Sequence, residues 1–405
     1  MKRILFAWEM GSNFGHVNKV SQVAAQLQGE MDVTFAARNV IAVRDLAPNL
    51  EARLLQAPYS PMRAPTQHEM TGACYPGLLL LDGWDQSKRL IPLIESWRAL
   101  FDLVQPDVLV TQAAPTALLA AHGLGLKTAL LGSGWDAPPR ANPMPCLSPD
   151  DPEAVALAAQ QESDVLTQAN LALAHHNAPK LEQFSDLLDV EEYLLVAYPE
   201  SDHFAPRHKY EAAPAPYLGQ LLSVQTGQHM TWRTTGLPRI FAYLRPGSGP
   251  YNAAVQGLSQ LGPDADIILA APGIDPVHAE SLRARNVQIC DGPARLDKLL
   301  PDCDLGISHG SNGIGSAFLA FGVPQIGLPG HREQMMFTQA VARAGCALGV
   351  AGSYAGPQIV EAVQKALNSV NLKERAHQIK DKIASEGLKN PAQKAADILR
   401  ELAAS

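Results

Sequence analysis

The segment ISHGSNGIGSAFLAFGVPQIGLPGHREQ, Ile307–Gln334, has the pattern of two buried strands that each lead into a polar loop. The apolar stretch Leu305–Ser308 predicts a strand, followed by a glycine-containing loop and a helix that begins near Ile314. A second strand is predicted over Gln325–Leu328, and Glu333-Gln334 comes after it. Because the carboxyl ends of parallel strands meet at one edge of a sheet, the loop and the acid–amide pair are expected to lie together there.

The first of these loops is suited to a diphosphate. Backbone N–H groups at the start of a helix bind phosphate, and a histidine adds one more donor. A carboxylate beside an amide can hold neighbouring hydroxyls of a sugar, because the carboxylate only accepts hydrogen bonds and the amide both donates and accepts. The residues assigned to the diphosphate are His309, Gly310, Ser311, Asn312 and Gly313, and those assigned to the sugar are Glu333 and Gln334.

The rest of the chain repeats this alternation of apolar strands and amphipathic helices. Strands that are apolar along their whole length favour a parallel sheet covered by helices on both faces. The pattern restarts after a stretch with little periodicity, so we predict two domains: an N-terminal domain over residues 1–213, a linker over 214–236 and a C-terminal domain over 237–388. A final helix is predicted over residues 389–405, and the N-terminal domain is one surface on which it can pack. The expected strands are Ile4–Trp8, Asp32–Ala37, Val108–Thr111, Thr128–Leu131, Leu194–Ala197, Ile240–Leu244, Ile267–Ala271, Val287–Cys290, Leu305–Ser308 and Gln325–Leu328.

Two further glycine loops follow predicted strands. The loop GSNFGH contains Gly11, Asn13 and Gly15, and it ends at His16. Glycines let a backbone approach a ligand closely, and imidazole can act as a general base because it titrates near neutral pH. An ordinary turn with a packing histidine is the alternative, and the loop matches neither G-x-G-x-x-G nor a Walker A motif.

In the second domain, the PGSG loop follows the strand Ile240–Leu244. Its Gly247 and Ser248 are expected to contribute to diphosphate binding.

The composition is that of a globular protein. Of the 405 residues, 46% are hydrophobic and 18% charged, and the net charge of −8 comes with no basic cluster, which argues against nucleic acid as a partner. Five scattered cysteines without C-x-x-C spacing are typical of reduced thiols in a cytoplasmic protein. The apolar start is too short for a signal peptide and no run approaches eighteen apolar residues, so we expect no membrane span, while peripheral attachment stays open.

The segment from His309 to Gln334 resembles the nucleotide-sugar signature of GT-B glycosyltransferases, in the branch of UDP-glycosyl and macrolide transferases. That signature reads roughly H-G-G-x-G-T-x-x-E-A-L-x-x-G-V-P-x-x-x-x-P-x-x-x-D/E-Q, and it aligns here without a gap. The similarity continues in NVQICDGPARLDKLLPDCDLGIS, AVARAGCALGV and GSNFGHVNKVSQVAAQLQGEMDVTFAAR. The resemblance implies an α/β fold of two facing Rossmann-like domains with a cleft between them. It also implies sugar transfer from a nucleotide-diphosphate sugar.

The resemblance gives each site a role. His309 and the amides of Gly310–Gly313 would contact the diphosphate, and Glu333 and Gln334 would contact the donor sugar. His16 would deprotonate a hydroxyl of a small-molecule or lipid-linked acceptor, whose oxygen attacks the anomeric carbon and inverts it. Loop amides and the helix dipole stabilise the leaving group, so no metal and no cofactor is expected.

One acidic motif is, in contrast, typical of enzymes that use a metal ion. Asp302-Cys303-Asp304 spells the D-x-D of metal-dependent transferases, but it comes just before a strand, where the family usually has an acid.

Three positions depart from the family pattern. Gln112 stands where an aspartate usually orients the base histidine, and Asp82 or Asp85 could substitute for it. Ala317 stands where an acid commonly binds the ribose, which puts a dTDP-sugar donor on an equal footing with a UDP-sugar. Gly292–Pro293 stands where a tryptophan often stacks on the base. The alternatives are therefore a nucleotide-sugar-binding protein without transferase activity, or another two-domain nucleotide-sugar enzyme such as a 2-epimerase.

The sequence does not name the acceptor. Two long loops, Pro58–Leu90 and Gly134–Asp150, are expected to form its pocket. Their large side chains would make that pocket partly apolar or, alternatively, would only cover the edge of the sheet. These side chains are Tyr59, Tyr75, Trp84, Trp135 and Met144.

Overall fold

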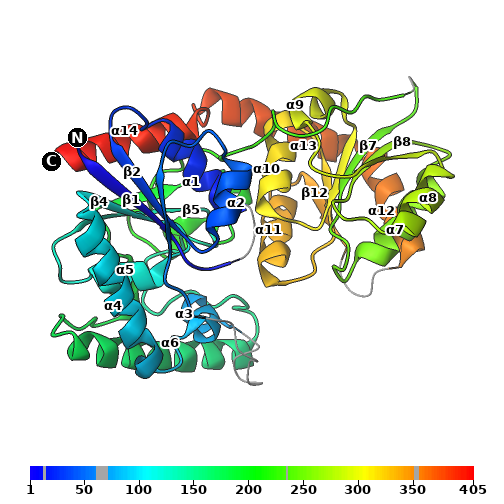
Figure 1. The fold of residues 1–405 in the computed structure, drawn as a ribbon. Coiled ribbons are helices and arrows are strands. Elements are labelled where there is room, and N and C mark those ends of the chain that lie inside the picture. Colours follow the sequence, from blue (N-terminus) through cyan, green and yellow to red (C-terminus); the bar gives the residue numbers. More distant parts are fainter. Residues whose placement is uncertain (12–14, 61–71, 234–235, 351–354) are drawn as a thin grey trace. The chain divides into compact units, whose positions relative to one another are not determined.

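The chain forms two compact units, each made of separate stretches of sequence (Figure 1). The computed structural model describes residues 1–11, 15–60, 72–233, 236–350 and 355–405. Unit 1 contains Met1–Ala197, Pro206–Leu221 and Asn390–Ser405, and unit 2 contains Tyr198–Ala205 and Leu222–Lys389. Asn13 of the first glycine loop lies outside the described residues.

The described part of unit 1 is built on one six-stranded parallel sheet with the strand order β3-β2-β1-β4-β5-β6. The order reverses between β1 and β4, and ligands of such sheets bind beyond the carboxyl ends of the strands at that reversal. The strands are β1 (Arg3–Trp8), β2 (Asp32–Ala37), β3 (Arg53–Gln56), β4 (Val108–Thr111), β5 (Lys127–Gly132) and β6 (Glu192–Leu195). The helices are α1 (Gly15–Ala25), α2 (Val40–Leu46), α3 (Tyr75–Leu79), α4 (Ser87–Val104), α5 (Pro115–Ala121), α6 (Pro152–His175) and α14 (Pro391–Ala404).

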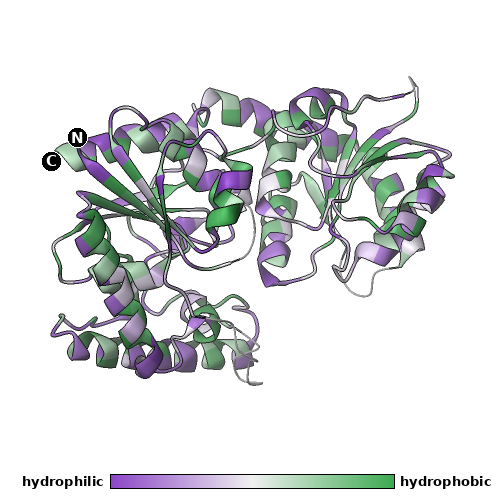
Figure 2. Ribbon diagram, in the orientation of Figure 1, coloured by the Kyte–Doolittle hydropathy of each residue, from purple (hydrophilic) through white to green (hydrophobic). Residues whose placement is uncertain are grey.

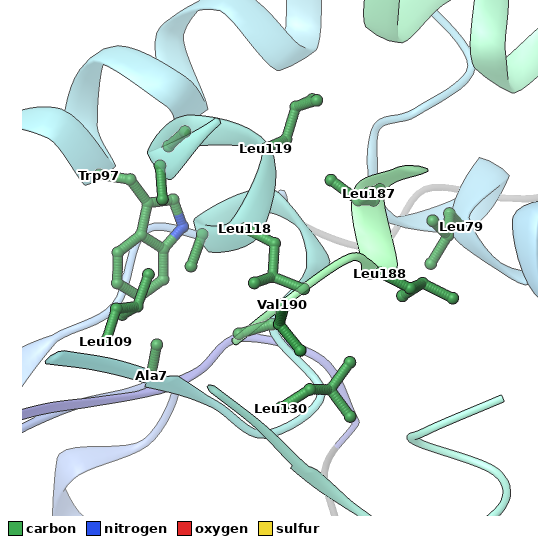
Figure 3. Packing of buried hydrophobic residues seen from close by; sticks show 14 of the residues in the cluster. Ala7, Leu79, Trp97, Leu109, Leu118, Leu119, Leu130, Leu187, Leu188 and Val190 are labelled. Atoms are coloured by element: carbon green, nitrogen blue, oxygen red, sulfur yellow. The ribbon is translucent and has the colours of Figure 1, made fainter. Parts of the chain in front are cut away.

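Both faces of this sheet are covered, because neighbouring residues of each strand enter different hydrophobic clusters. Leu5 and Ala7 of β1 belong to a cluster with Trp97 of α4 and Leu118 of α5, which Figure 3 shows above the strands. Phe6 belongs to the opposite cluster, which α1 and α14 cover. Figure 2 shows the result as hydrophobic strands beneath helices of mixed hydropathy. The predicted two-sided parallel sheet is therefore confirmed.

Unit 2 repeats the design, and its described residues form a six-stranded parallel sheet with the order β12-β11-β10-β7-β8-β9. Here the reversal falls between β7 and β10. The strands are β7 (Arg239–Tyr243), β8 (Asp266–Ala270), β9 (Val287–Cys290), β10 (Leu305–Ser308), β11 (Gln325–Gly327) and β12 (Ala347–Gly349). The helices are α7 (Tyr251–Leu261), α8 (Pro276–Arg283), α9 (Leu296–Leu299), α10 (Asn312–Phe321), α11 (Arg332–Arg343), α12 (Gly356–Leu367) and α13 (Val370–Ser385).

The strands that the sequence missed, or placed two residues from their true start, lie at the edges of the sheets. β3 has two exposed and two half-buried residues, and β12 has only one buried residue of three. Neither therefore carries the continuous apolar run that marks the central strands. β6 begins at Glu192, two residues before the prediction, because backbone pairing with β5 rather than hydropathy sets its start.

None of the helices in the described ranges is long and apolar enough to cross a membrane. All five cysteines are free thiols.

Candidate functional site

The first candidate site lies at the strand reversal of unit 1. His16 is in the first turn of α1, which follows β1, and Gln112 directly follows β4, which pairs with β1. The Nδ1 atom of His16 lies 2.8 Å from Oε1 of Gln112. Gln112 is completely buried, and its own backbone N–H donates to the carbonyl of Ala7 at 2.9 Å. The acceptor for His16 is therefore held by the sheet itself.

The ring of His16 is fixed on two more sides. It stacks on Trp8 with the ring centroids 5.5 Å apart and the planes 19° from parallel. Gly11 has φ +79°, and a Cβ atom there would lie 2.5 Å from Nε2 of His16. A side chain at Gly11 would thus displace the imidazole, which explains the glycine by close approach as well as by its left-handed backbone. Gly15, in contrast, begins α1 and has open space beside it.

This geometry selects one tautomer of His16. The amide oxygen of Gln112 can only accept a hydrogen bond, so Nδ1 carries the proton and the basic lone pair is on Nε2. An imidazole held in this way can take a proton from a hydroxyl. An amide stabilises the resulting imidazolium less than a carboxylate does, because hydrogen bonds to ionised groups are roughly twice as strong.

Sequence reasoning missed a buried acid beside this site. Glu9 follows β1 and is 3% exposed; its carboxyl oxygens accept hydrogen bonds from Nε1 of Trp97 at 2.8 Å and from the backbone N–H of Thr116 at 2.5 Å. Burial raises the pKa of Glu9 to about 8 against these hydrogen bonds, and the charge of Asp82 acts in the same direction as burial. Glu9 therefore ties the end of β1 to α4 and α5. Its position directly after a strand was the available signal.

The two aspartates proposed as substitutes for the usual acid have other partners. An Oδ1 atom of Asp82 lies 3.8 Å from Nη1 of Arg38, and Asp85 lies 3.9 Å from Arg89 one helical turn away. Burial raises the pKa of Asp82, and Arg38 opposes that shift. The hydrogen bond that orients His16 is the one that its Nδ1–H donates to Gln112.

The second candidate site lies at the strand reversal of unit 2, where three loops meet. A Cβ atom on Gly310, which has φ +74°, would lie 2.4 Å from Oγ1 of Thr338 and 3.0 Å from the carbonyl oxygen of Gln334. The loop after β10 is therefore packed directly on α11. A Cβ atom on Gly330, in the loop after β11, would lie 3.6 Å from Pro250 in the loop after β7. The predicted gathering of loops at one edge is what the structure has.

The N-terminus of α10 carries buried polar atoms without partners among the described residues. Ser311 is the N-cap, and its side chain makes no capping hydrogen bond. Asn312 is 9% exposed with both amide atoms unpartnered, and the hydroxyl of the fully buried Ser316 is unpartnered as well. Gly313 is exposed, with no described atom within 4 Å of where its Cβ would lie. Buried polar groups normally have partners, and the first N–H groups of a helix also lack them, so this turn suits an anionic ligand.

His309 is neutral in this setting. It is 4% exposed, and burial together with the positive charge of Arg245 lowers its pKa to about 4, although a hydrogen bond with the Tyr243 backbone and the charge of Glu333 act against the shift. Its Nδ1 atom is buried and has no partner among the described residues. An anion at this position would favour the protonated ring, which has two N–H groups.

The acid–amide pair lies in the first turn of α11, with its two members in different environments. Gln334 is 8% exposed, and its Oε1 atom accepts a hydrogen bond from the N–H of Gly330 at 2.8 Å. Glu333 is half-buried, with Oε1 3.5 Å from Nε2 of His203 and Oε2 3.9 Å from Nδ1 of His331. Gln334 thus shapes the loop with its oxygen, while the carboxylate of Glu333 stands between two histidines.

The remaining predicted positions divide between the site edge and the core. Gly247 has φ +81° and is exposed, while the hydroxyl of Ser248 donates to the carbonyl of Arg245 at 2.8 Å and so closes its own turn. Ala317 is 1% exposed and belongs to the hydrophobic cluster around Phe241 and Phe318. Arg245 was not singled out from the sequence, although it follows β7 by the same rule that located His309.

The D-x-D motif lies at the opposite end of the sheet. Asp304 accepts a hydrogen bond from the N–H of Arg239, which begins β7, at 2.9 Å, and Asp302 lies 3.8 Å from the Arg239 guanidinium. The sulfur of Cys303 lies 3.2 Å from the carbonyl of Leu305. These acids fix the amino ends of β7 and β10, away from the loop at His309.

Of the side chains expected to line an acceptor pocket, most are core residues. Tyr75, Trp84 and Met144 are buried in the same cluster as Leu5 and Ala7, so for these three the packing alternative holds. Tyr59 is 40% exposed beneath the guanidinium of Arg38, and Trp135 is half-buried. Only these two keep a surface that could meet a ligand.

Comparison with known proteins found a family model that matches the C-terminal part of the chain. Residues 257–402 match the family model of the erythromycin biosynthesis protein CIII-like C-terminal domain. No curated protein sequence matches the chain.

Solved structures of similar fold cover nearly the whole chain. The glycotransferase of kitacinnamycin superposes with a TM-score of 0.72 at 16% identity, over 99% of this chain and 98% of that one. Glycosyltransferase VinC in complex with dTDP gives 0.68 at 14% identity, over 99% of both chains. Spinosyn rhamnosyltransferase SpnG complexed with spinosyn aglycone gives 0.66 at 18% identity, over 98% and 100%. The chain thus has the GT-B fold of two Rossmann-like domains.

Proposed function

We propose that this protein is an inverting glycosyltransferase that moves a sugar from a nucleoside-diphosphate sugar to a hydroxyl of a small, partly apolar acceptor. One observation carries the proposal: the N-terminal turn of α10 holds the buried amide of Asn312, which no described residue contacts by a hydrogen bond, beside the neutral His309. Both residues lie within the stretch that matches the CIII-like domain. An anionic ligand would satisfy these groups, and the loop N–H groups would bind its phosphate oxygens.

In this proposal the residues of unit 2 bind the donor. The N–H groups of Gly310–Gly313 and the ring of His309 hold the diphosphate, and Arg245 supplies positive charge nearby, as its effect on His309 indicates. Glu333 accepts hydrogen bonds from hydroxyls of the sugar. As the bond between the anomeric carbon and the diphosphate oxygen breaks, its electron pair stays on that oxygen, and the same N–H groups stabilise the growing charge.

The acceptor is activated in unit 1. Nε2 of His16 takes the proton of the acceptor hydroxyl while its oxygen forms the new bond to the anomeric carbon, opposite the leaving diphosphate. Gln112 holds the ring in the tautomer that this step needs, through its 2.8 Å contact with Nδ1. We propose that no metal ion takes part, because side chains and N–H groups of the described residues offer positive charge and donors to the leaving group.

For the nucleotide and the acceptor, we propose a chemical class and not a single compound. The side chain of Ala317 offers no polar group to a ribose 2′-hydroxyl, so dTDP and UDP should both serve as the leaving group unless Ser316 or Asn312 takes over that contact. VinC, a structure of the same fold, was solved in complex with dTDP, and SpnG was solved with a spinosyn aglycone. These two complexes support a dTDP-sugar as donor and an aglycone as acceptor.

A second candidate is a nucleotide-sugar-binding protein that does not transfer the sugar. The observation in its favour is Gln112, because an amide stabilises imidazolium less than the aspartate usual at this place.

The test is a transfer assay with UDP-glucose and dTDP-glucose and a panel of hydroxylated polyketides and phenols, with the product detected by mass spectrometry and its anomeric configuration determined by NMR. We expect a glycosylated product with inverted configuration, and we expect His16→Ala to lower its rate roughly 10²-fold or more while dTDP still binds. Nucleotide binding without any product would favour the binding protein. A His16→Ala variant of unchanged turnover would show that His16 is not the base.

A further inference from the structure

The carboxylate of Glu333 is held from a distant part of the sequence. His203 belongs to the short stretch Tyr198–Ala205, which packs within unit 2 although the chain on either side of it belongs to unit 1. Its Nε2 atom lies 3.5 Å from Oε1 of Glu333. The side chain of His203 is fully enclosed, whereas that of Glu333 keeps 19% of its surface exposed. His203 is therefore part of the buried interior of unit 2, whereas the carboxylate of Glu333 is accessible to a ligand.

His203 has little freedom to move. Its ring contacts that of Phe337, one helical turn beyond Glu333 on α11, with centroids 6.4 Å apart. The backbone before it forms the 3₁₀ turn η3 (Pro199–Ser201), closed by a hydrogen bond from the N–H of Tyr198 to the hydroxyl of Ser201 at 3.2 Å. A neighbouring ion pair, Lys382 to Glu200 at 2.7 Å, anchors the same stretch to α13.

Glu333 by itself would not be oriented. It lies in the first turn of α11, where the helix dipole favours a carboxylate but does not fix its rotation. Among the described residues, Oε2 of Glu333 has the exposed His331 at 3.9 Å as its one charged neighbour, while Oε1 has the enclosed ring of His203. A hydroxyl-binding carboxylate discriminates between sugars only when its own rotamer is held.

We propose that His203 is a positioning residue of the donor site, holding Glu333 in the orientation that binds the sugar of the donor. This inference rests on the proposed function, because it takes Glu333 as the sugar ligand. His203 touches neither the sugar nor the diphosphate in this account. It acts through the carboxylate, so its loss should affect the intact donor and spare the free nucleotide.

Three variants of the full chain separate positioning from packing. His203→Leu fills the enclosed space against Phe337 without a hydrogen-bond donor. His203→Gln keeps a side-chain N–H near the place of Nε2. Lys382→Met removes the other anchor of the same stretch and leaves Glu333 untouched, so it serves as the matched control.

Each protein is titrated calorimetrically with dTDP and with dTDP-glucose. We expect His203→Leu to weaken dTDP-glucose about tenfold and dTDP less than about twofold, since one oriented hydrogen-bonding group is lost from the sugar site alone. His203→Gln should recover most of the loss, and Lys382→Met should bind both ligands as the wild type does. The double variant Glu333→Ala/His203→Leu should bind dTDP-glucose as weakly as Glu333→Ala alone, and no more weakly.

The contrary results are distinct. If His203→Leu binds dTDP-glucose like the wild type, or weakens both ligands equally, or if His203→Gln behaves like His203→Leu, the positioning role is wrong while the proposed function stands. If the wild type binds neither dTDP nor UDP nor their sugars, the proposed function fails, and the inference fails with it.

Discussion

Replacing Gln112 by glutamate tests how the base is held. The exchange puts a carboxylate oxygen where the amide oxygen now lies 2.8 Å from Nδ1 of His16. It breaks no hydrogen bond of the Gln112 side-chain amide, because Nε2 of Gln112 has no partner among the described residues. The backbone of Gln112 stays tied to Ala7. Gln112→Glu therefore changes the charge of the acceptor and little else.

The size of the effect follows from that single bond. A hydrogen bond to a neutral acceptor contributes about 0.5–1.5 kcal/mol and one to a charged acceptor about 1.5–3, so imidazolium gains about 1–1.5 kcal/mol. Since about 1.36 kcal/mol corresponds to one pKa unit, the rising limb of the pH–rate profile should move about one pH unit upward. The same stabilisation in the transition state should raise the plateau rate by about tenfold at most. Burial of the new carboxylate disfavours its charged form and so opposes both changes. In the limiting case, neither the pH limb nor the plateau rate changes.

The assay is kcat/KM against pH, with dTDP-glucose and the acceptor found in the transfer screen. Gln112→Leu is the companion variant, because it keeps the volume and removes the acceptor. Its rate should fall at least about tenfold, with dTDP affinity unchanged, since the ring loses both its tautomer and its orientation. A Gln112→Leu enzyme as active as the wild type would show that this contact does not orient the base. The reasoning would also fail if Gln112→Glu moved the limb downward.

Three further outcomes follow from the buried groups. The pKa of His309 is about 4 in the folded protein and 6.5 ordinarily, so the unfolded chain takes up the proton first as the pH falls. The free energy of unfolding should therefore decrease by about 3 kcal/mol between pH 6.5 and 4. Denaturation of His309→Gln at several pH values should lack this decrease. Glu9 has a folded pKa of about 8 against 4.5, so it holds a proton that the unfolded state releases and stability should fall as pH rises through this range; Glu9→Gln should flatten that slope, and an unchanged slope would mean that Glu9 is ionised when folded. UDP and dTDP should bind with affinities within about tenfold, since Ala317 offers no polar group to the 2′-hydroxyl, and a preference for UDP beyond roughly a hundredfold in calorimetry would contradict this.

Most of the fold was accessible from the sequence, because the central strands are buried on both faces and read as apolar runs. Their loops then locate the sites, since His16, Gln112 and His309 all directly follow or lie just beyond central strands at the two reversals of strand order. α6 was not predicted, because two of the positions that it buries at helical spacing, Gln161 and Glu162, are polar. The edge strands β3 and β12 were missed because they are short and partly exposed.

Part of the site could not be read from the sequence at all. His203 lies 130 positions before Glu333, in a stretch without periodicity, and only the packing of that stretch on α11 brings the two side chains together. Glu9 looked like the polar end of a strand, and its burial depends on Trp97 and Thr116, which come from α4 and α5. Tyr75, Trp84 and Met144 were assigned to a pocket or to packing, and hydropathy cannot separate the two for a large side chain in a long loop.

The central claim is that the N-terminal turn of α10 binds the diphosphate, and Asn312→Leu tests it most directly. The exchange removes a buried amide that has no partner among the described residues and keeps the branched shape of the side chain. We predict a protein that is more stable by about 1–3 kcal/mol in denaturant and yet binds dTDP at least about tenfold more weakly in calorimetry. Higher stability combined with weaker dTDP binding would show that Asn312 serves the ligand and not the fold. Unchanged dTDP affinity in the Asn312→Leu protein would contradict the account.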